Sequence, residues 1–231
     1  MCGRYVRRSD KQRIAEAFRV AEGLADLVLG PDDYNVAPTT FQPVIRESRE
    51  GDAREILLMR WGLIPFFTKQ LADVKGVSTI NARAESVATG ATWREPFKKR
   101  RCLVPADAFY EWKRVDAPGK RQTREPFAFT VGGGAFAFAG LWDAWKDAQG
   151  NWLQSFAIIT TEANEVMAPV HTRMPVILHP RDYSRWLSRE VTEQLPIDLL
   201  RPFPAEEMER RPANPLVGNV RNNGPEMLNS A

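Results

Sequence analysis

Short apolar runs bounded by turn residues fill most of this chain, and their spacing constrains the fold more than any other feature. Each of the segments 42–47 and 54–60 contains a short apolar run, and the two flank Glu50-Gly51-Asp52, which predicts a hairpin. Helical segments occur at irregular intervals, without the strand–helix–strand rhythm of a parallel sheet. We therefore expect an α+β fold: a single domain with a mostly antiparallel, barrel-like sheet and flanking helices.

The other expected strands are equally short and apolar. They lie at residues 2–6, 102–105, 108–113, 126–131, 135–142, 152–160 and 174–178. Gly132-Gly133-Gly134 separates two of them and predicts a second hairpin. Ser9-Asp10-Lys11-Gln12 has the pattern of a capping box for an amphipathic helix over residues 10–20. Two further helices are expected over residues 180–187 and 190–199.

Composition narrows the class of protein. The chain has 231 residues, 43% of them hydrophobic, which is enough for a substantial core. Its net charge of +3 is compatible with a polyanionic partner. There is no apolar run of about 18 residues and no apolar signal segment, so neither a membrane span nor secretion is expected. Two cysteines fit a reducing compartment, so we expect a cytoplasmic protein, associated with the nucleoid in a bacterium.

The chain contains no internal repeat and no low-complexity linker. We therefore expect one domain over residues 1–222 and a polar tail at residues 223–231 that is frayed. No exposed heptad pattern or apolar helix face is evident, which favours a monomer.

Cys2 is the most reactive candidate, because removal of Met1 would leave a free α-amine and a thiol on one residue. Such groups ordinarily titrate at pH ~7.7–8.0 and ~8.5, so both have reactive forms at neutral pH. A 1,2-aminothiol condenses with an aldehyde to a thiazolidine, or its amine serves as base for its own thiol in an N-terminal nucleophile enzyme. The alternative is that Cys2 is a buried small apolar residue.

Metal chemistry is not expected. Cys2, Cys102, His171 and His179 are the only cysteines and histidines, and none lie at the spacing of a zinc site. We therefore expect no metal and no cofactor.

Four further residues are candidates for chemistry or binding. Glu111 points opposite to its bulky neighbours in a strand, where partial desolvation would suit general acid work; an exposed strand carboxylate is the alternative. His171 precedes an apolar strand and is either catalytic or structural. Asn81 and Arg83 share one face of an extended segment, where turn chemistry and a surface ion pair are the alternatives.

Seven short motifs occur in a fixed order along the chain. They are MCGR at 1–4, YNVAPT at 34–39, WGLIP at 61–65, INARAES at 80–86, CLVPADAFYEWK at 102–113, HTRMPVIL at 171–178 and VGNVRN at 217–222. In this combination the chain resembles the SRAP family, the SOS response-associated abasic-site processing proteins. The resemblance spans nearly the whole chain, roughly residues 2–222.

The resemblance implies a function in DNA damage. Family members bind an abasic site in single-stranded DNA, and their N-terminal Cys forms a thiazolidine crosslink with the open-ring sugar. Their catalytic residues correspond to Cys2, Asn81, Glu111 and His171. A weak AP-lyase activity through the imine, and an autoproteolytic activity, are implied as well.

The resemblance also implies a DNA-binding surface. Arginines that bind the DNA backbone correspond to Arg4, Arg83 and Arg173. The residues that wedge and stack near the lesion correspond to Asn35, Pro38, Phe66 and Phe67. Many relatives carry Trp where this chain has Phe66-Phe67, a change that preserves stacking. Little sequence preference is expected, because there is no base to read at the lesion.

Three alternatives stay open from the sequence. Class II glutamine amidotransferases also begin Met-Cys-Gly and attack an amide through an N-terminal Cys. An autoproteolytic thiol peptidase would use the same Cys–His–Glu set. A non-covalent single-stranded DNA-binding module would leave Cys2 with only a structural role.

Overall fold

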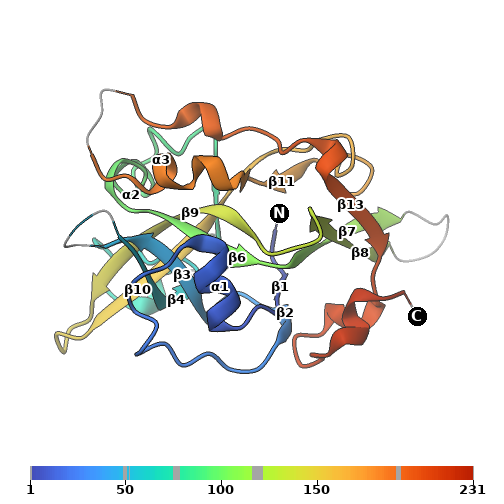
Figure 1. Cartoon of the computed structure of the whole chain (residues 1–231), viewed down its shortest axis with the longest axis horizontal. Coiled ribbons are helices and arrows are strands. Elements are labelled where there is room, and N and C mark those ends of the chain that lie inside the picture. The colour runs from blue at the N-terminus through green and yellow to red at the C-terminus, as the bar shows by residue number, and fades with distance from the viewer. Residues whose placement is uncertain are drawn as a thin grey trace.

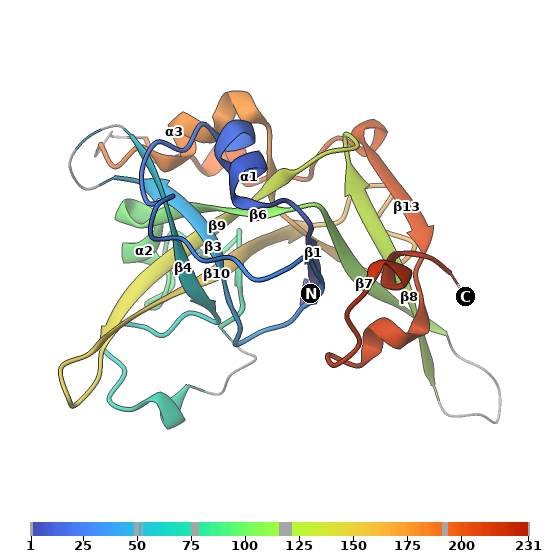
Figure 2. The same ribbon diagram turned by 60° about the horizontal axis from the view of Figure 1, so that its bottom comes forward.

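The computed structural model describes residues 2–48, 51, 53–74, 79–115, 122–190 and 194–230. Over these residues the strands form a five-stranded sheet and an eight-stranded sheet that lie beside each other (Figures 1 and 2). Short helices cover one side of the larger sheet (Figure 1). The expected α+β fold with a mostly antiparallel, barrel-like sheet is confirmed. None of the helices in the described part of the chain has the length and apolar character needed to cross a bilayer.

The larger sheet closes on itself. Its strands follow the order β10-β4-β3-β6-β9, and β9 pairs again with β10, which completes a barrel. Antiparallel pairs dominate, but β10 runs parallel to both β4 and β5, so the sheet is mixed. The strands are β3 (Phe41–Glu47), β4 (Arg54–Trp61), β5 (Asn81–Arg83), β6 (Arg101–Ala106), β9 (Phe136–Lys146), β10 (Trp152–Glu162), β11 (Arg173–Pro175) and β12 (Ile177–Leu178).

The smaller sheet is antiparallel throughout and joins distant parts of the chain. Its strand order is β13-β8-β7-β1-β2. These strands are β1 (Tyr5–Arg7), β2 (Asp33–Val36), β7 (Ala108–Val115), β8 (Thr123–Val131) and β13 (Met208–Pro212). The residues just after Cys2 are therefore fixed between β2 and β7, which places the N-terminal segment inside the fold.

One of the two predicted hairpins is correct. β3 and β4 pair in register from Phe41↔Arg60 to Glu47↔Arg54, around a turn that lies mostly outside the described residues. The hairpin over Gly132-Gly133-Gly134 is wrong: β8 pairs with β7 and β13, whereas β9 pairs with β6, β10 and β12. Positive φ at Gly132 (56°) and Gly133 (70°) lets the chain cross from one sheet to the other. Local turn residues mark the bend, but long-range pairing chooses the partner strands.

The helices are shorter than expected. They are α1 (Lys11–Phe18), α2 (Arg94–Lys99) and α3 (Tyr183–Leu187), with 3-10 turns at Leu71–Asp73, Pro180–Asp182, Ile197–Leu199, Ala205–Glu207, Pro215–Gly218 and Pro225–Leu228. Of the helix predicted over 190–199, the described residues contain only the turn at Ile197–Leu199, and residues 191–193 lie outside them.

The first helix is capped differently from the prediction. Asp10 is the N-cap, and its carboxylate accepts hydrogen bonds from the backbone N–H groups of Gln12 (3.0 Å) and Arg13 (2.9 Å). Ser9 instead donates its hydroxyl to Asp107 at 2.8 Å. The predicted capping box is therefore wrong. The Ser9 hydroxyl bonds to the carboxylate of Asp107, which is distant in sequence, and does not cap the helix.

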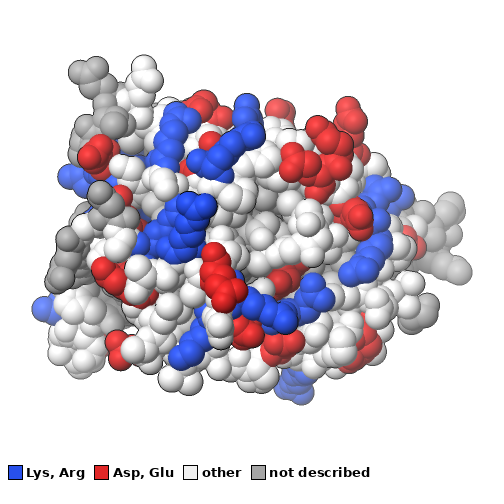
Figure 3. All heavy atoms as spheres, viewed as in Figure 1, with Lys and Arg blue, Asp and Glu red and all other residues white. Residues whose placement is uncertain are grey.

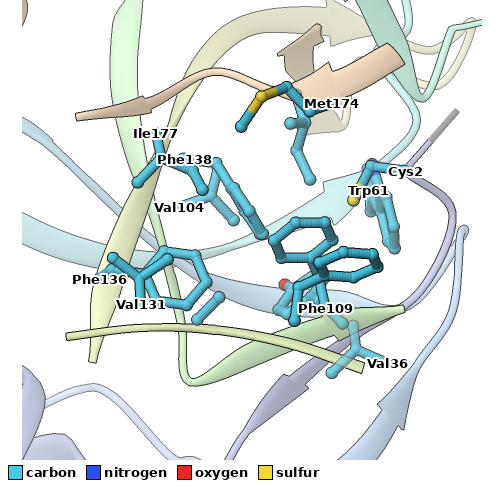
Figure 4. Packing of buried hydrophobic residues seen from close by; sticks show 14 of the residues in the cluster. Cys2, Val36, Trp61, Val104, Phe109, Val131, Phe136, Phe138, Met174 and Ile177 are labelled. Carbon is cyan, nitrogen blue, oxygen red and sulfur yellow. The ribbon is translucent and has the colours of Figure 1, made fainter. Parts of the chain in front are cut away.

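Two large apolar clusters hold the fold together. The first combines residues from both sheets and includes Cys2, Tyr5, Trp61 and Phe138 (Figure 4). The second lies under the helices and includes Ile14 of α1, Phe97 of α2 and Trp186 of α3. Because the first cluster contains Cys2, the beginning of the described chain is part of the core.

The C-terminal segment packs more closely than its polar composition suggests. Met227 and Leu228 are buried with Val6 and Tyr110 in a third cluster. The expectation of a frayed end is therefore wrong for these two residues, since each buries an apolar side chain. The domain boundary at residue 222 stays a prediction.

Candidate active site

Cys2 and Asn81 form the centre of the candidate site. Cys2 is 1% exposed, and Figure 4 shows its sulfur turned toward the other side chains of the cluster. The Asn81 side-chain N–H donates to the backbone carbonyl of Cys2 at 2.9 Å. Asn81 begins β5, where its pairing with Ile158 of β10 fixes the backbone. A barrel strand thus holds Cys2 through an amide side chain.

Burial determines the state of the thiol. It raises the pKa of the Cys2 thiol far above the ordinary value, and the negative charge of Glu111 raises this pKa further. A hydrogen bond from the backbone N–H of Arg4 acts in the opposite direction but is a smaller effect. The thiol is therefore neutral at physiological pH, and any reaction at sulfur needs a nearby group to accept its proton.

Glu111 lies on β7 and is 4% exposed, so it is a buried carboxylate rather than a solvated one. Phe109, two residues earlier, packs in the cluster that contains Cys2, whereas Tyr110 and Trp112 belong to a separate cluster. The alternation of the strand therefore directs Glu111 to the side of Cys2. Its Oε2 accepts a hydrogen bond from the Trp112 backbone N–H at 3.3 Å.

His171 is half-buried and lies at the end of the loop that leads into β11. Its Nδ1 accepts a hydrogen bond from the backbone N–H of Arg173 at 2.9 Å, and a neutral ring that does so carries its proton on Nε2. Val170 and Met174 on either side of this segment pack in the Cys2 cluster. His179 lies elsewhere, with its Nε2 at 3.8 Å from Oε1 of Glu207.

The three candidate DNA-binding arginines have different surroundings. Arg4 is half-buried, its Nε and Nη1 have no hydrogen-bond partner within the described ranges, and burial lowers the pKa of its guanidinium. Arg83 is exposed at the end of β5, on the same face as Asn81. Arg173 is occupied, because its two Nη atoms lie at 2.5 and 3.0 Å from the carboxylate of Glu85.

The aromatic pair after β4 is exposed. Phe66 and Phe67 are 61% and 55% exposed, with ring centroids 5.4 Å apart in an edge-to-face arrangement. The backbone N–H of Phe66 donates to Asp143 at 3.2 Å and anchors the segment to the barrel. Two adjacent exposed phenylalanines on an anchored segment form a stacking surface.

The remaining wedge candidates lie in and beside β2. Pro38 is half-buried in the loop that follows this strand. Asn35 is 4% exposed, and its side-chain Nδ2 lies within hydrogen-bond distance of the carbonyls of Val217 (3.2 Å), Asn219 (3.0 Å) and Asn222 (2.8 Å). Its amide therefore holds the C-terminal VGNVRN segment in place, so any influence of Asn35 on DNA is exerted through that segment.

Comparison with known proteins identifies the family. The family model described as SOS response associated peptidase (SRAP) matches residues 1–220. The chain belongs to the SRAP family. The resemblance drawn from the seven motifs is thereby confirmed.

Several relatives align with this SRAP protein over its full length or most of it. Abasic site processing protein YoqW of Bacillus subtilis (strain 168) is 38% identical over 232 residues, covering 100% of both chains. Abasic site processing protein HMCES of Rattus norvegicus is 33% identical over 227 residues, covering 84% of this chain and 64% of its own. A crystal structure of a protein from Bacteroides thetaiotaomicron has a TM-score of 0.87 at 25% identity and covers 100% of both chains.

The basic run Lys98-Lys99-Arg100-Arg101 at the end of α2 ends in two arginines with structural contacts in this SRAP protein. Arg101 is 5% exposed and donates from its guanidinium to the carbonyls of Phe97 and Trp186. Arg100 pairs with Asp143 at 3.3 Å. On the face shown in Figure 3, basic side chains (blue) are interspersed with acidic ones (red). On that face, an anion would therefore bind at individual residues rather than at one basic patch.

The sequence did not reveal the partner of Arg173. Glu85 stands two residues after Arg83 in the INARAES motif, where its position alone gave no sign of a bond to a residue 88 positions away. Thr160 of β10 was also missed; its backbone carbonyl accepts a hydrogen bond from Arg173 Nη2 at 2.6 Å. The contacts of Arg173 with Glu85 and with Thr160 arise because β5 and β11 lie on either side of β10. No local sequence pattern indicates this arrangement.

Proposed function

We propose that this SRAP protein processes abasic sites in single-stranded DNA by forming a covalent thiazolidine crosslink through Cys2 after removal of Met1. The observation that carries the proposal is the placement of Cys2, buried beside Asn81 and within electrostatic range of Glu111. The family match and the names of relatives such as YoqW and HMCES support abasic-site processing over glutamine hydrolysis. Met1 itself lies outside the described residues.

The reaction begins at the α-amine. The amine adds to the aldehyde carbon of the open-ring sugar, and loss of one water gives an imine. The Cys2 sulfur then forms a bond to the imine carbon while the thiol proton passes to the nitrogen, which closes the thiazolidine. The net change joins the aminothiol to the aldehyde and releases one water, so no cofactor is needed.

The neighbouring side chains supply the proton transfers. Glu111 faces the thiol and serves as the base that receives its proton, which the raised pKa of the Cys2 thiol makes necessary. Glu111 and His171 share the transfers in ring opening and dehydration. Asn81 fixes the Cys2 carbonyl and so orients the amine and thiol together. The imine also permits elimination of the 3′ phosphate, which gives a weak AP-lyase activity.

DNA binds through phosphate contacts and stacking. Arg4 and Arg83 provide guanidinium donors on the Cys2 and Asn81 side of the site. Arg173 contributes the part of its guanidinium that Glu85 and Thr160 leave accessible. Phe66 and Phe67 stack on bases beside the lesion, with Pro38 as a wedge. Stacking of this kind requires unpaired bases, which supports a single-stranded substrate.

One experiment tests the proposal. Purified protein is mixed with a single-stranded oligonucleotide that carries one abasic site and is resolved on a denaturing gel. A heat-stable shifted band that is lost in Cys2→Ala is expected. Glutamine hydrolysis without a band would point to an amidotransferase, and salt-sensitive binding without a band would point to a non-covalent DNA-binding module.

A second arm tests the role of the amine. Protein that carries an uncleaved N-terminal tag has the thiol of Cys2 but no α-amine at that residue. It is expected to bind the oligonucleotide without crosslinking. Full crosslinking by the tagged protein would contradict the thiazolidine mechanism.

A further inference from the structure

A forked ion pair lies close to the candidate site. Nη1 and Nη2 of Arg173 lie at 2.5 and 3.0 Å from Oε1 and Oε2 of Glu85, so guanidinium and carboxylate meet in the bidentate geometry. The Arg173 side chain is 20% exposed and the Glu85 side chain 57%. Nη2 also donates to the backbone carbonyl of Thr160 at 2.6 Å. The guanidinium is therefore held at two places.

This pair spans a strand of the barrel. Thr160 of β10 pairs with Arg83 of β5 on one edge and with Pro175 of β11 on the other. Arg173 starts β11, and Glu85 follows β5 by two residues. The Arg173 side chain thus crosses β10 and ties the start of β11 to the segment after β5.

The backbone of Arg173 faces the catalytic candidate His171. Its N–H donates to Nδ1 of the imidazole at 2.9 Å, and its carbonyl oxygen lies 3.1 Å from the same nitrogen. The N–H serves the neutral ring, and the carbonyl can accept from Nδ1 once that nitrogen is protonated. One residue therefore offers a partner to both protonation states that a proton-transfer residue passes through.

We propose that Glu85 is a positioning residue for the crosslinking reaction: it fixes Arg173 across β10 and thereby holds the Arg173 backbone against His171. Arg173 is the first residue of β11 and pairs with Glu162 of β10, so its backbone lies at one end of the ladder. At such a terminus the side-chain anchor contributes to the placement of the peptide group. This inference rests on the proposed function, because it concerns the same His171.

Single-turnover crosslinking kinetics test the proposal. The crosslinking rate is measured against protein concentration for the wild type and Glu85→Gln, which gives a maximal rate and a half-saturating concentration. Glu85→Gln is expected to lower the maximal rate about fivefold, as for coupled neighbouring residues. The half-saturating concentration is expected to stay within about twofold of the wild type, because Arg83 and Arg4 remain to bind phosphate.

Two matched variants separate positioning from general destabilisation. Glu95→Gln removes another exposed glutamate from an ion pair, here with Lys98 on α2, and is expected to leave both constants unchanged. Glu85→Asp retains a carboxylate and is expected to recover part of the lost rate. In an Arg173→Gln background, Glu85→Gln should have no further effect, because the group it positions is already absent.

The contrary results are distinct. An unchanged maximal rate in Glu85→Gln would overturn the proposal. A tighter half-saturating concentration at the wild-type rate would overturn it as well, since Glu85 would then be competing with DNA phosphate for Arg173. Absence of a crosslink with the wild type would instead refute the proposed function, so the two failures are distinguishable.

Discussion

The side-chain amide of Asn81 donates to the backbone carbonyl of Cys2 at 2.9 Å, across 79 residues of sequence. Asn81→Ala is expected to slow crosslinking about tenfold, since a buried hydrogen bond that orients a reactant is worth roughly 1–1.5 kcal/mol. The rate at saturating DNA on a denaturing gel measures this. Asn229→Ala, an exposed asparagine near the C-terminus, is the control. A wild-type rate in Asn81→Ala would show that the Cys2 carbonyl needs no partner.

Alkaline pH is expected to destabilise the fold through its two buried thiols. Burial raises the pKa of Cys2 and of Cys102, so each thiol binds its proton more tightly in the folded state than in the unfolded chain. Their contribution is complete below the unfolded thiol pKa of about 8.5 and declines as pH rises above it. Each thiol should reduce the free energy of unfolding by about 1.4 kcal/mol per pH unit between about pH 8.5 and 10.

The measurement is denaturant unfolding under reducing conditions at several pH values. Cys2→Ala should lose about half of the alkaline slope, and Cys102→Ala should lose the other half. The window ends at about pH 10 because tyrosines such as Tyr5, whose pKa burial also raises, begin to contribute there. An unchanged slope in Cys2→Ala would argue that its thiol is solvated.

Stacking by the exposed aromatic pair predicts an effect on DNA affinity alone. Phe66→Ala and Phe67→Ala should each weaken binding of single-stranded DNA by about 5- to 150-fold, the range for loss of one stacked base. Thermal stability should change little, because both rings are more than half exposed. Trp152→Ala removes an equally exposed aromatic residue from β10 and should leave the affinity unchanged. Equal losses in all three variants would indicate non-specific contact.

Substitution of Asn35 is expected to lower the stability of the fold rather than to remove a direct contact with DNA. Asn35→Ala removes a donor that reaches three carbonyls and should reduce the free energy of unfolding by about 1–3 kcal/mol. Asn35→Asp should be worse, since a carboxylate would face the same carbonyl oxygens without a proton to donate. Denaturant titration measures the free energy of unfolding of both variants. Equal stability of Asn35→Asp and the wild type would contradict the assigned contacts.

Local patterns predicted the fold class and most strands because short apolar runs between turn residues can be recognised in the sequence itself. The β3–β4 hairpin and the strand over Trp152–Glu162 were predicted from such runs. The partner of β8 did not, since Gly132 and Gly133 mark a bend without stating where the next strand goes. Strand partners depend on the distant surfaces that each strand can cover, and no short window contains that information.

The sequence likewise predicts some features of the candidate site and not others. Motifs pointed to Cys2, Asn81, Glu111 and His171, whose roles remain to be tested. The sequence does not show that Arg173 forms an ion pair with Glu85, or that Arg101 donates its hydrogen bonds to backbone carbonyls. The residue type alone does not show whether an arginine binds phosphate or hydrogen-bonds to the carbonyls at the end of a helix. That depends on the residues around it in the folded structure.

The hydrogen bonds between Asn35 and the VGNVRN segment have a consequence for biosynthesis. Its donor and acceptors are 182 to 187 residues apart, so the NVAP loop can form these contacts only after residues 217–222 have left the ribosome. Cys2, by contrast, leaves the ribosome well before that segment. A nascent chain that stops before residues 217–222 would thus contain Cys2 without the contacts that Asn35 makes in the folded protein, so synthesis of this segment is the step that completes the surroundings of the proposed site.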